Sequence, residues 1–336
     1  MKLIVLLVAI ASIVRFCGAG VDESFIRAIR DGAMAKVVCR VVDDAGSPVS
    51  NATAHVWFSS YGRRQDNADW LVVTDGNGMF TVEHRTNEQL AWIVQKAGYY
   101  QTRGKILFRD RETEGPKVVD GKWQPYNEMR TLVLKRILNP IKLSDPNASC
   151  YHKYPVSGKW TGFDLQKCDW VSPLGNGRFA DMMIRFTHEM TSDGYLKTVD
   201  VSFSNNQCAG VYLMTKDSYS EMDSVYVANT NAVYTNSLRY ELERIGKRKR
   251  VIRELGTDEY LIFRTRTTVD HDGKLISAHY GRIMGDWRYW EKGGMSFGPV
   301  FFNPTPNDLN LEDAETARRS RLVYRQNLIF EQTPGK

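Results

Sequence analysis

The sequence predicts a mainly β protein of two domains, an N-terminal seven-stranded sandwich of the immunoglobulin type and a second β-rich domain built as a sandwich or a meander. Its 336 residues are more than one hydrophobic core usually supports. The 16 Tyr, 14 Phe and 8 Trp are residue types enriched in strands. Short apolar segments alternate with Gly, Asn, Asp and Pro turn signals, and few segments have the spacing of a long helix.

The composition is that of a globular protein without a strong charge bias. Hydrophobic residues make up 42% and charged residues 25%, which argues against disorder. If Lys2 and Arg15 are removed with a leader, the net charge falls by two from +6. The remaining positive charge is too small to indicate a nucleic-acid partner. We expect the densest basic run, residues 247–250, to be a solvated loop.

The N-terminus has the pattern of a secretory signal peptide, residues 1–19. Lys2 precedes the apolar run from Leu3 to Val14, and small residues follow at Cys17 to Gly20. Arg15 argues against a lipid-modified Cys17 and against an uncleaved anchor, the two alternatives. We therefore expect an exported protein, periplasmic, at the cell surface or extracellular, and no later segment is apolar enough to span a membrane.

The first domain is expected to begin with a short helical segment over residues 22–34, in which Asp22 is the N-cap. Valine-rich and alternating segments then predict strands, each separated from the next by turn residues. The expected strands are residues 36–42, 52–58, 70–74, 79–83, 90–95, 99–108 and 131–136.

The stretch Thr74-Asp75-Gly76-Asn77-Gly78-Met79-Phe80 predicts a hairpin between the third and fourth of these strands, because Gly and Asn tolerate positive φ. A calcium loop is the alternative. Met79 stands where a further oxygen ligand is needed, so we favour the hairpin.

Several spaced elements of this region resemble the carboxypeptidase regulatory-like domain, over about residues 35–136. They are Val42-Asp43-Asp44-Ala45-Gly46-Ser47-Pro48-Val49, Ala52, Thr74-Asp75 with Gly78 and Phe80, and Lys96-Ala97-Gly98-Tyr99. The resemblance implies a prealbumin-like sandwich that acts as a non-catalytic accessory module. The polar insertion over residues 59–67 departs from the family pattern.

The first domain is expected to end at Leu143, and residues 144–157, with two prolines, to form a linker to a second domain over 158–336. Strands are predicted at 179–186, 196–203, 210–214, 259–268 and 275–283, with an Asp-Gly hairpin at 269–274. Residues 236–245 are interpreted as one or two helical turns.

The second half also resembles the C-terminal region of uncharacterised exported bacterial proteins that carry a regulatory-like sandwich. The resemblance rests on Gly162-Phe163-Asp164-Leu165, Asp169-Trp170-Val171, Tyr280-Gly281-Arg282-Ile283 and Asn303-Pro304-Thr305-Pro306-Asn307-Asp308. It implies a domain organisation and no particular activity.

Carboxylates and aromatic residues of the second domain are the candidate site residues. Asp164, Asp169 and Asp181, with Glu189 nearby, could form the carboxylate pair of a glycoside hydrolase, although turn and cap roles are the favoured alternative. Two aromatic clusters could instead stack on sugar rings, or pack in the core or at a domain interface. Their candidate ligand-binding members are Trp160, Phe163, Trp170, Trp287 and Trp290.

Cleavage of the leader leaves Cys39, Cys150, Cys168 and Cys208. Export permits a disulfide, and Cys150 with Cys168 is the closest pair, whereas four buried thiols are the alternative. Cys150, His152 and Cys168 match no familiar zinc spacing, so we expect no metal, and motifs for nucleotides or a nucleophile elbow are absent from the sequence. No cofactor is therefore expected.

These patterns favour an exported, non-catalytic binding or scaffolding protein that recognises a polysaccharide, or else a protein at the cell surface. A glycan-active hydrolase that uses the second-domain carboxylates is the alternative, and an assembly component is a third reading.

Overall fold

The computed structural model describes residues 23–60, 68–87, 89–108, 117–144, 150–203, 208–216, 219–246, 248–251, 256, 258–285, 288–290 and 294–321. The protein is mainly β, as the sequence predicts. It divides into two compact units, the first ending at Arg136 and the second beginning at Ile137. The expected signal peptide lies outside the described residues.

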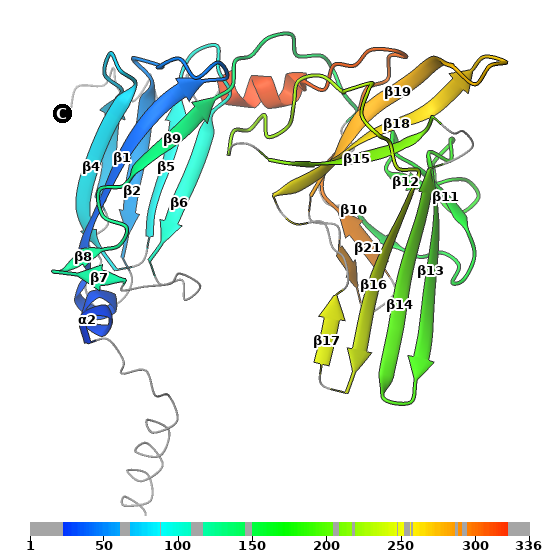
Figure 1. Cartoon of the computed structure of the whole chain (residues 1–336), viewed down its shortest axis with the longest axis horizontal. Helices are drawn as coiled ribbons and strands as arrows, with labels where there is room; N and C mark the ends of the chain where they lie inside the picture. Colours follow the sequence, from blue (N-terminus) through cyan, green and yellow to red (C-terminus); the bar gives the residue numbers. More distant parts are fainter. Residues whose placement is uncertain are drawn as a thin grey trace, which may run out of the picture. The chain divides into compact units, whose positions relative to one another are not determined.

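Two sheets enclose the core of the first unit (Figure 1). In one sheet β1 (Ala33–Asp43) pairs antiparallel with β4 (Met79–Thr86) and parallel with both β8 (Lys122–Trp123) and β9 (Met129–Leu134), while β7 (Val118–Val119) pairs with β8. The other sheet has the order β3 (Ala68–Val73), β2 (Thr53–Ser59), β5 (Gln89–Gln95) and β6 (Thr102–Leu107). The seven predicted strands are all present, and the two-residue strands β7 and β8 were not predicted.

Alternation of side chains produces this core. On β1 the buried residues Ala35, Val37, Cys39 and Val41 alternate with less buried ones, as expected for a strand with one face on a core. The core-facing residues of β2 and β5 meet them from the second sheet, so the first unit has a core of its own.

Helix α2 (Glu23–Asp31) lies with β7 and β8 at one end of the first unit (Figure 1). It ends at Gly32, whose φ of +79° suits a residue without a Cβ and whose N–H donates to the carbonyl of Ala28. The helix is shorter than expected, because Ala33 and Met34 already belong to β1.

The stretch from Thr74 to Phe80 is not the hairpin that the sequence predicts. A tight turn forms, in which the Asp75 N–H donates to the Met79 carbonyl at 3.0 Å. However, β3 before the turn pairs with β2, and β4 after it pairs with β1 in the other sheet. The turn therefore carries the chain from one layer of the sandwich to the other.

The described residues of the second unit form three antiparallel sheets. The largest has the order β12 (Asp169–Trp170), β11 (Thr161–Asp164), β13 (Met182–Thr191), β14 (Gly194–Phe203), β16 (Ser237–Ile245) and β17 (Arg248–Val251). A four-stranded sheet joins β15 (Gly210–Thr215), β18 (Glu259–Val269), β19 (Leu275–Met284) and β22 (Val300–Phe302), and a three-stranded sheet joins β10 (Cys150–Lys153), β21 (Gly294–Phe297) and β20 (Arg288–Trp290).

The four-stranded sheet has a core on each face. Leu261 and Phe263 of β18 pack with residues of the six-stranded sheet, whereas the alternate residues Tyr260 and Ile262 pack on the other side, with Leu311 among others. Residues 314–321 form a helix, and Asp313 caps it by accepting the Thr316 N–H at 2.8 Å. Among the described residues, no helix is long and apolar enough to cross a membrane.

Two sequence-based interpretations of the second domain are wrong. Residues 237–245 form β16 rather than helical turns, because Leu238, Tyr240 and Leu242 alternate toward the core with a period of two. The basic run contributes β17, paired with β16, rather than a loop.

The boundary between the units also differs from the expected one at Leu143. Ile141 bridges to Asp313 and Leu143 is buried in a core of the second unit, while β10 lies within the expected linker. The second unit thus includes the segment that the sequence assigned to the end of the sandwich.

Candidate functional site

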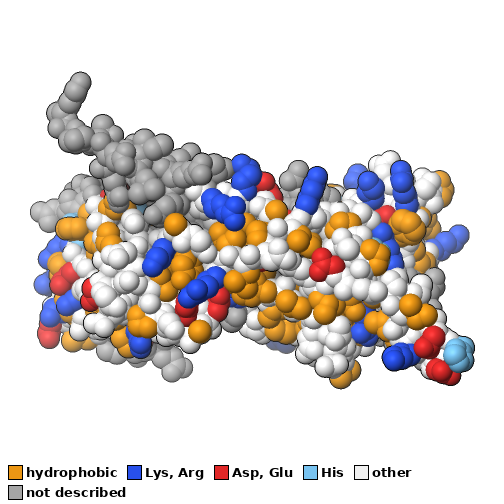
Figure 2. Space-filling model, turned by 90° about the horizontal axis from the view of Figure 1, so that it is seen from above, with side chains coloured by type: hydrophobic (Ala, Val, Ile, Leu, Met, Phe, Trp, Pro, Cys, Tyr) orange, Lys and Arg blue, Asp and Glu red, His pale blue; other side chains and the backbone are white. Residues whose placement is uncertain are grey.

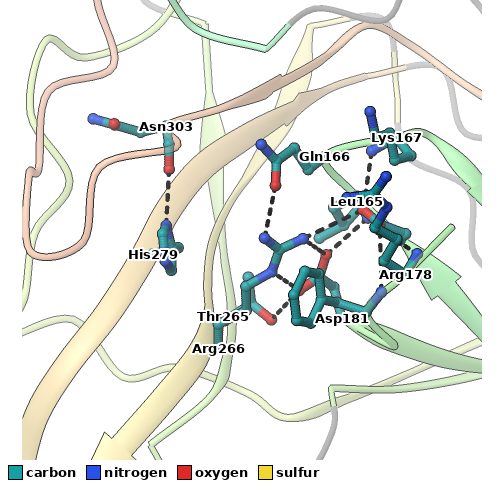
Figure 3. Close-up of polar contacts among 11 residues, drawn as sticks. Leu165, Gln166, Lys167, Arg178, Asp181, Thr265, Arg266, His279 and Asn303 are labelled. Carbon is teal, nitrogen blue, oxygen red and sulfur yellow. Dashed lines mark hydrogen bonds and ion pairs between the residues drawn. The ribbon is translucent and has the colours of Figure 1, made fainter.

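A partly buried arginine, Arg266, binds carboxylates from one segment of the second unit (Figure 3). Arg266 lies on β18 where the pairing register with β19 shifts, between Thr265 and Thr268, and its φ is +50°. A bulge of this kind turns a side chain away from the regular alternation. The guanidinium points toward the chain segment between β11 and β13.

The guanidinium of Arg266 is held by polar and aromatic contacts. Nε and Nη2 donate to the two oxygens of Asp181 at 2.9 and 3.0 Å, and Nη1 donates to Gln166 Oε1 at 2.7 Å. Nη2 also lies 3.3 Å from Asp164 Oδ1. The rings of Phe179 and Phe302 lie 4.3 and 4.5 Å from Cζ, so two aromatic rings pack against the cation.

Asp181 is the main acceptor of this cluster. It is 1% exposed and also accepts the Leu165 N–H at 2.9 Å and the Thr265 hydroxyl at 3.1 Å. Burial raises the pKa of Asp181, while the bonds from Arg266 act in the opposite direction. The carboxylate therefore joins the β11–β13 segment to β18.

The other predicted carboxylates also accept backbone donors. Asp164, 1% exposed, accepts the N–H groups of Lys167, Arg178 and Phe179 at 2.9, 2.8 and 3.1 Å. Asp169 accepts the N–H groups of Trp170 and Asn176, each at 2.8 Å. These are the turn and loop roles that the sequence analysis favoured over catalysis.

Glu189 does not join this group, since it is exposed on β13 beyond the buried part of the strand. The structure thus brings Asp164 and Asp181 onto one arginine and leaves Glu189 outside.

Two of the predicted ligand-binding aromatics are core residues. Phe163 is fully buried and Trp170 is 4% exposed, and their rings pack edge to face at 5.2 Å. The indole N–H of Trp170 donates to the Lys153 carbonyl at 2.9 Å. The ligand-binding interpretation is wrong for both, because neither ring can stack on a ligand. Trp287 and the side chain of Trp290 lie outside the described residues.

Trp160 remains as an exposed aromatic residue, at 43%. It precedes β11 and lies beside Arg185 of β13, whose Cζ is 4.8 Å from the ring centroid. Arg185 faces Asp200 on β14, and Asp200 faces Arg239 on β16. These four side chains form one row across the solvent-facing side of the six-stranded sheet, which we call the outer face.

Ion pairs hold the row in place. Arg185 Nη2 lies 2.9 Å from Asp200 Oδ2, and Arg239 Nη1 lies 3.3 Å from Asp200 Oδ1. The sequence alone does not bring together Arg185, Asp200 and Arg239, because their proximity depends on the register of three strands. Their alternation with apolar residues along each strand was the available signal.

Exposed apolar side chains alone do not single out this surface. Figure 2 shows apolar side chains lying among Lys and Arg side chains over the face seen there. What distinguishes the outer face is that the ring of Trp160 lies beside charged side chains that are paired with one another.

The described residues do not test the predicted disulfide between Cys150 and Cys168. The side chain of Cys150 lies outside the described residues, so its pairing with Cys168 stays a prediction. Cys168 Sγ lies 3.9 Å from His152 Nε2. Cys39 is fully buried, and burial raises the pKa of its thiol to about 12, as for a small hydrophobic residue. Within the described part of the chain, no three His, Cys, Asp or Glu residues are grouped to hold a metal ion.

Comparisons with known proteins give little guidance. No model of a protein family matches the chain, and no curated protein matches it. Solved structures that are similar in part are 3-chlorocatechol 1,2-dioxygenase from Rhodococcus opacus 1CP and hydroxyquinol 1,2-dioxygenase from Pseudomonas putida DLL-E4, both at 16% identity with TM-scores of 0.24 and 0.23. The alignments cover 32% of this chain and 61% and 58% of those chains. A likeness this slight carries no argument about fold or activity.

Proposed function

We propose that the protein is an exported, non-catalytic binding protein that recognises a polysaccharide through the outer face of the six-stranded sheet. The observation that carries the proposal is the exposed indole of Trp160, which lies beside Arg185 on the outer face. A rigid aromatic ring stacks on the apolar face of a sugar, and neighbouring charged groups hydrogen-bond to hydroxyl groups.

The carboxylates favour this proposal over a hydrolase. A glycosidase needs two carboxyl groups that face a substrate and keep free acid and base functions. Asp164 and Asp181 are each 1% exposed, and their oxygens accept hydrogen bonds from backbone groups and from Arg266. Such carboxylates hold loops in place.

The first unit has a supporting role in this proposal. We take it as a carboxypeptidase regulatory-like accessory domain, on the residues that resemble that family. Export rests on the sequence of residues 1–19. The second unit would then carry the ligand specificity.

A glycan panel tests the proposal. The mature chain, Trp160→Ala and the control Tyr219→Ala are compared for binding and for release of reducing ends. Tyr219 is a suitable aromatic control because it is 78% exposed and belongs to no strand of the six-stranded sheet. We expect Trp160→Ala to weaken binding about tenfold, or ~1.4 kcal/mol, and Tyr219→Ala to leave it unchanged. Release of reducing ends, or equal binding by Trp160→Ala, would overturn the proposal.

A further inference from the structure

Strand β3 forms one end of its sheet in the first unit and is unusually apolar on its exposed side. In the described part of the chain it pairs only with β2. Leu71 and Val73, on the face away from the core, are 49 and 55% exposed, and Trp70 on the opposite face, beside His84, is 42% exposed. An exposed apolar strand at a sheet edge is a template for pairing with another strand.

The hydrogen-bonding direction of β3 follows from the turn after it. The Thr74 N–H donates to the Ala52 carbonyl of the β2 side at 2.9 Å. Because bonding alternates along an antiparallel pair, the backbone groups of Asp69, Leu71 and Val73 point away from β2. These residues therefore present an open row of donors and acceptors.

Other sheet edges carry charged residues that discourage such pairing. At the opposite end of the same sheet, β6 exposes Arg103 and Lys105, and β4 at the end of the other sheet exposes Glu83. In the second unit the edge strand β17 is basic. Charged edges are a common protection against association, and β3 has only Asp69.

We propose that β3 pairs with β3 of a second copy of this chain, antiparallel and centred on Leu71, so that two four-stranded sheets become one continuous sheet. In this register Leu71 faces its own equivalent, and Asp69 faces Val73 of the second copy. The two Asp69 carboxylates are thus kept four residues apart, and each lies 3.5 Å from His55 Nε2 of its own chain. Self-pairing in this register therefore brings no like charges opposite each other.

Matched lysine substitutions test the register. Leu71→Lys places two lysines opposite each other, whereas Val73→Lys places each lysine opposite Asp69. We expect sedimentation velocity of the mature chain to show a dimer, a dissociation constant raised at least about tenfold by Leu71→Lys, and a dimer retained by Val73→Lys. A wild-type chain that is monomeric at every concentration, or equal effects of the two lysines, would overturn the proposal.

Crosslinking gives a second readout. Directly opposed residues of a hydrogen-bonded antiparallel pair have Cα atoms about 5.5 Å apart, within the range of a disulfide. Leu71→Cys should form a covalent dimer under mild oxidation, and Val73→Cys should not, since its equivalents lie far apart. A covalent dimer with Val73→Cys alone would contradict the register, and pairing with a different protein would leave both variants uncrosslinked.

Discussion

Arg266 donates from Nε and Nη2 to the two oxygens of Asp181, at 2.9 and 3.0 Å, in a site where Asp181 is almost fully buried. Arg266 belongs to β18 of the four-stranded sheet, and Asp181 lies just before β13 of the six-stranded sheet. The ion pair therefore joins the two layers of the second unit. Removing one partner would leave an uncompensated buried charge.

The first prediction is that Arg266→Met lowers the free energy of unfolding of the second unit by about 3–5 kcal/mol, because Asp181 and Asp164 lose their shared cation. Urea unfolding followed by tryptophan fluorescence measures the change. Arg266→Lys should recover only part of the loss, since a lysine cannot donate to both oxygens of a carboxylate in the same plane.

Arg185→Met is the matched control for this prediction. Its ion pair with Asp200 involves a side chain 38% exposed, and such pairs contribute about 0–1 kcal/mol. Equal losses for the two arginine variants would show that the Arg266 cluster has no special structural role.

The second prediction concerns two aspartates whose pKa shifts have opposite signs. Burial raises the pKa of Asp181 above the unfolded value, so its contribution to stability falls as pH rises from the unfolded pKa through the folded one. The hydrogen bond from Arg136, with the Ser47 N–H, lowers the pKa of Asp43. That contribution is present above the unfolded pKa and is lost as pH falls through the folded one.

Unfolding free energies of the wild type, Asp181→Asn and Asp43→Asn are therefore to be compared across the acidic range. As pH rises, the difference in unfolding free energy between the wild type and Asp181→Asn should become smaller. The difference between the wild type and Asp43→Asn should become larger. The same trend for both pairs would contradict the assignment of one or the other carboxylate.

The local structure of the turns could be predicted from the sequence, because the same short sequence pattern occurs three times and forms the same hydrogen bonds each time. Asp43, Asp75 and Asp270 each begin an Asp-x-x-Gly turn. In each turn the aspartate N–H donates to the carbonyl four residues on, and its Oδ1 accepts two later N–H groups. At Asp270 the turn joins the paired strands β18 and β19, as predicted.

Long-range pairing could not be predicted in the same way. The turn at Asp75 has the same bonds as the turn at Asp270, yet β3 and β4 enter different sheets. Arg266 shows the same limit in the candidate site, since nothing near it in the sequence points to the carboxylates of Asp181 and Asp164, which lie 85 and 102 residues earlier in the chain. Burial of Phe163 and Trp170 likewise depends on the packing of distant strands.

The third prediction separates the turn itself from its tertiary setting. Gly46, Gly78 and Gly273 occupy the same turn position, with φ of +79°, +74° and +79°. An alanine at any of them meets the cost of a left-handed conformation, about 1–2 kcal/mol. A Cβ at Gly46 or Gly273 would meet no atom within 4 Å, whereas a Cβ at Gly78 would lie 2.4 Å from the Val41 carbonyl oxygen.

Gly78→Ala should therefore destabilise the first unit by about 1–3 kcal/mol more than Gly46→Ala does, because β1 must shift to relieve the overlap. Gly46→Ala is the better control, since it lies in the same unit and the same cooperative unfolding transition reports on both. The Val41 N–H donates to the Gly78 carbonyl at 2.8 Å, so the close backbone approach at Gly78 lies where β4 begins to run alongside β1. Equal urea midpoints for the two alanine variants would mean that the turn at Asp75 acts only locally and that other contacts direct the crossing between the sheets.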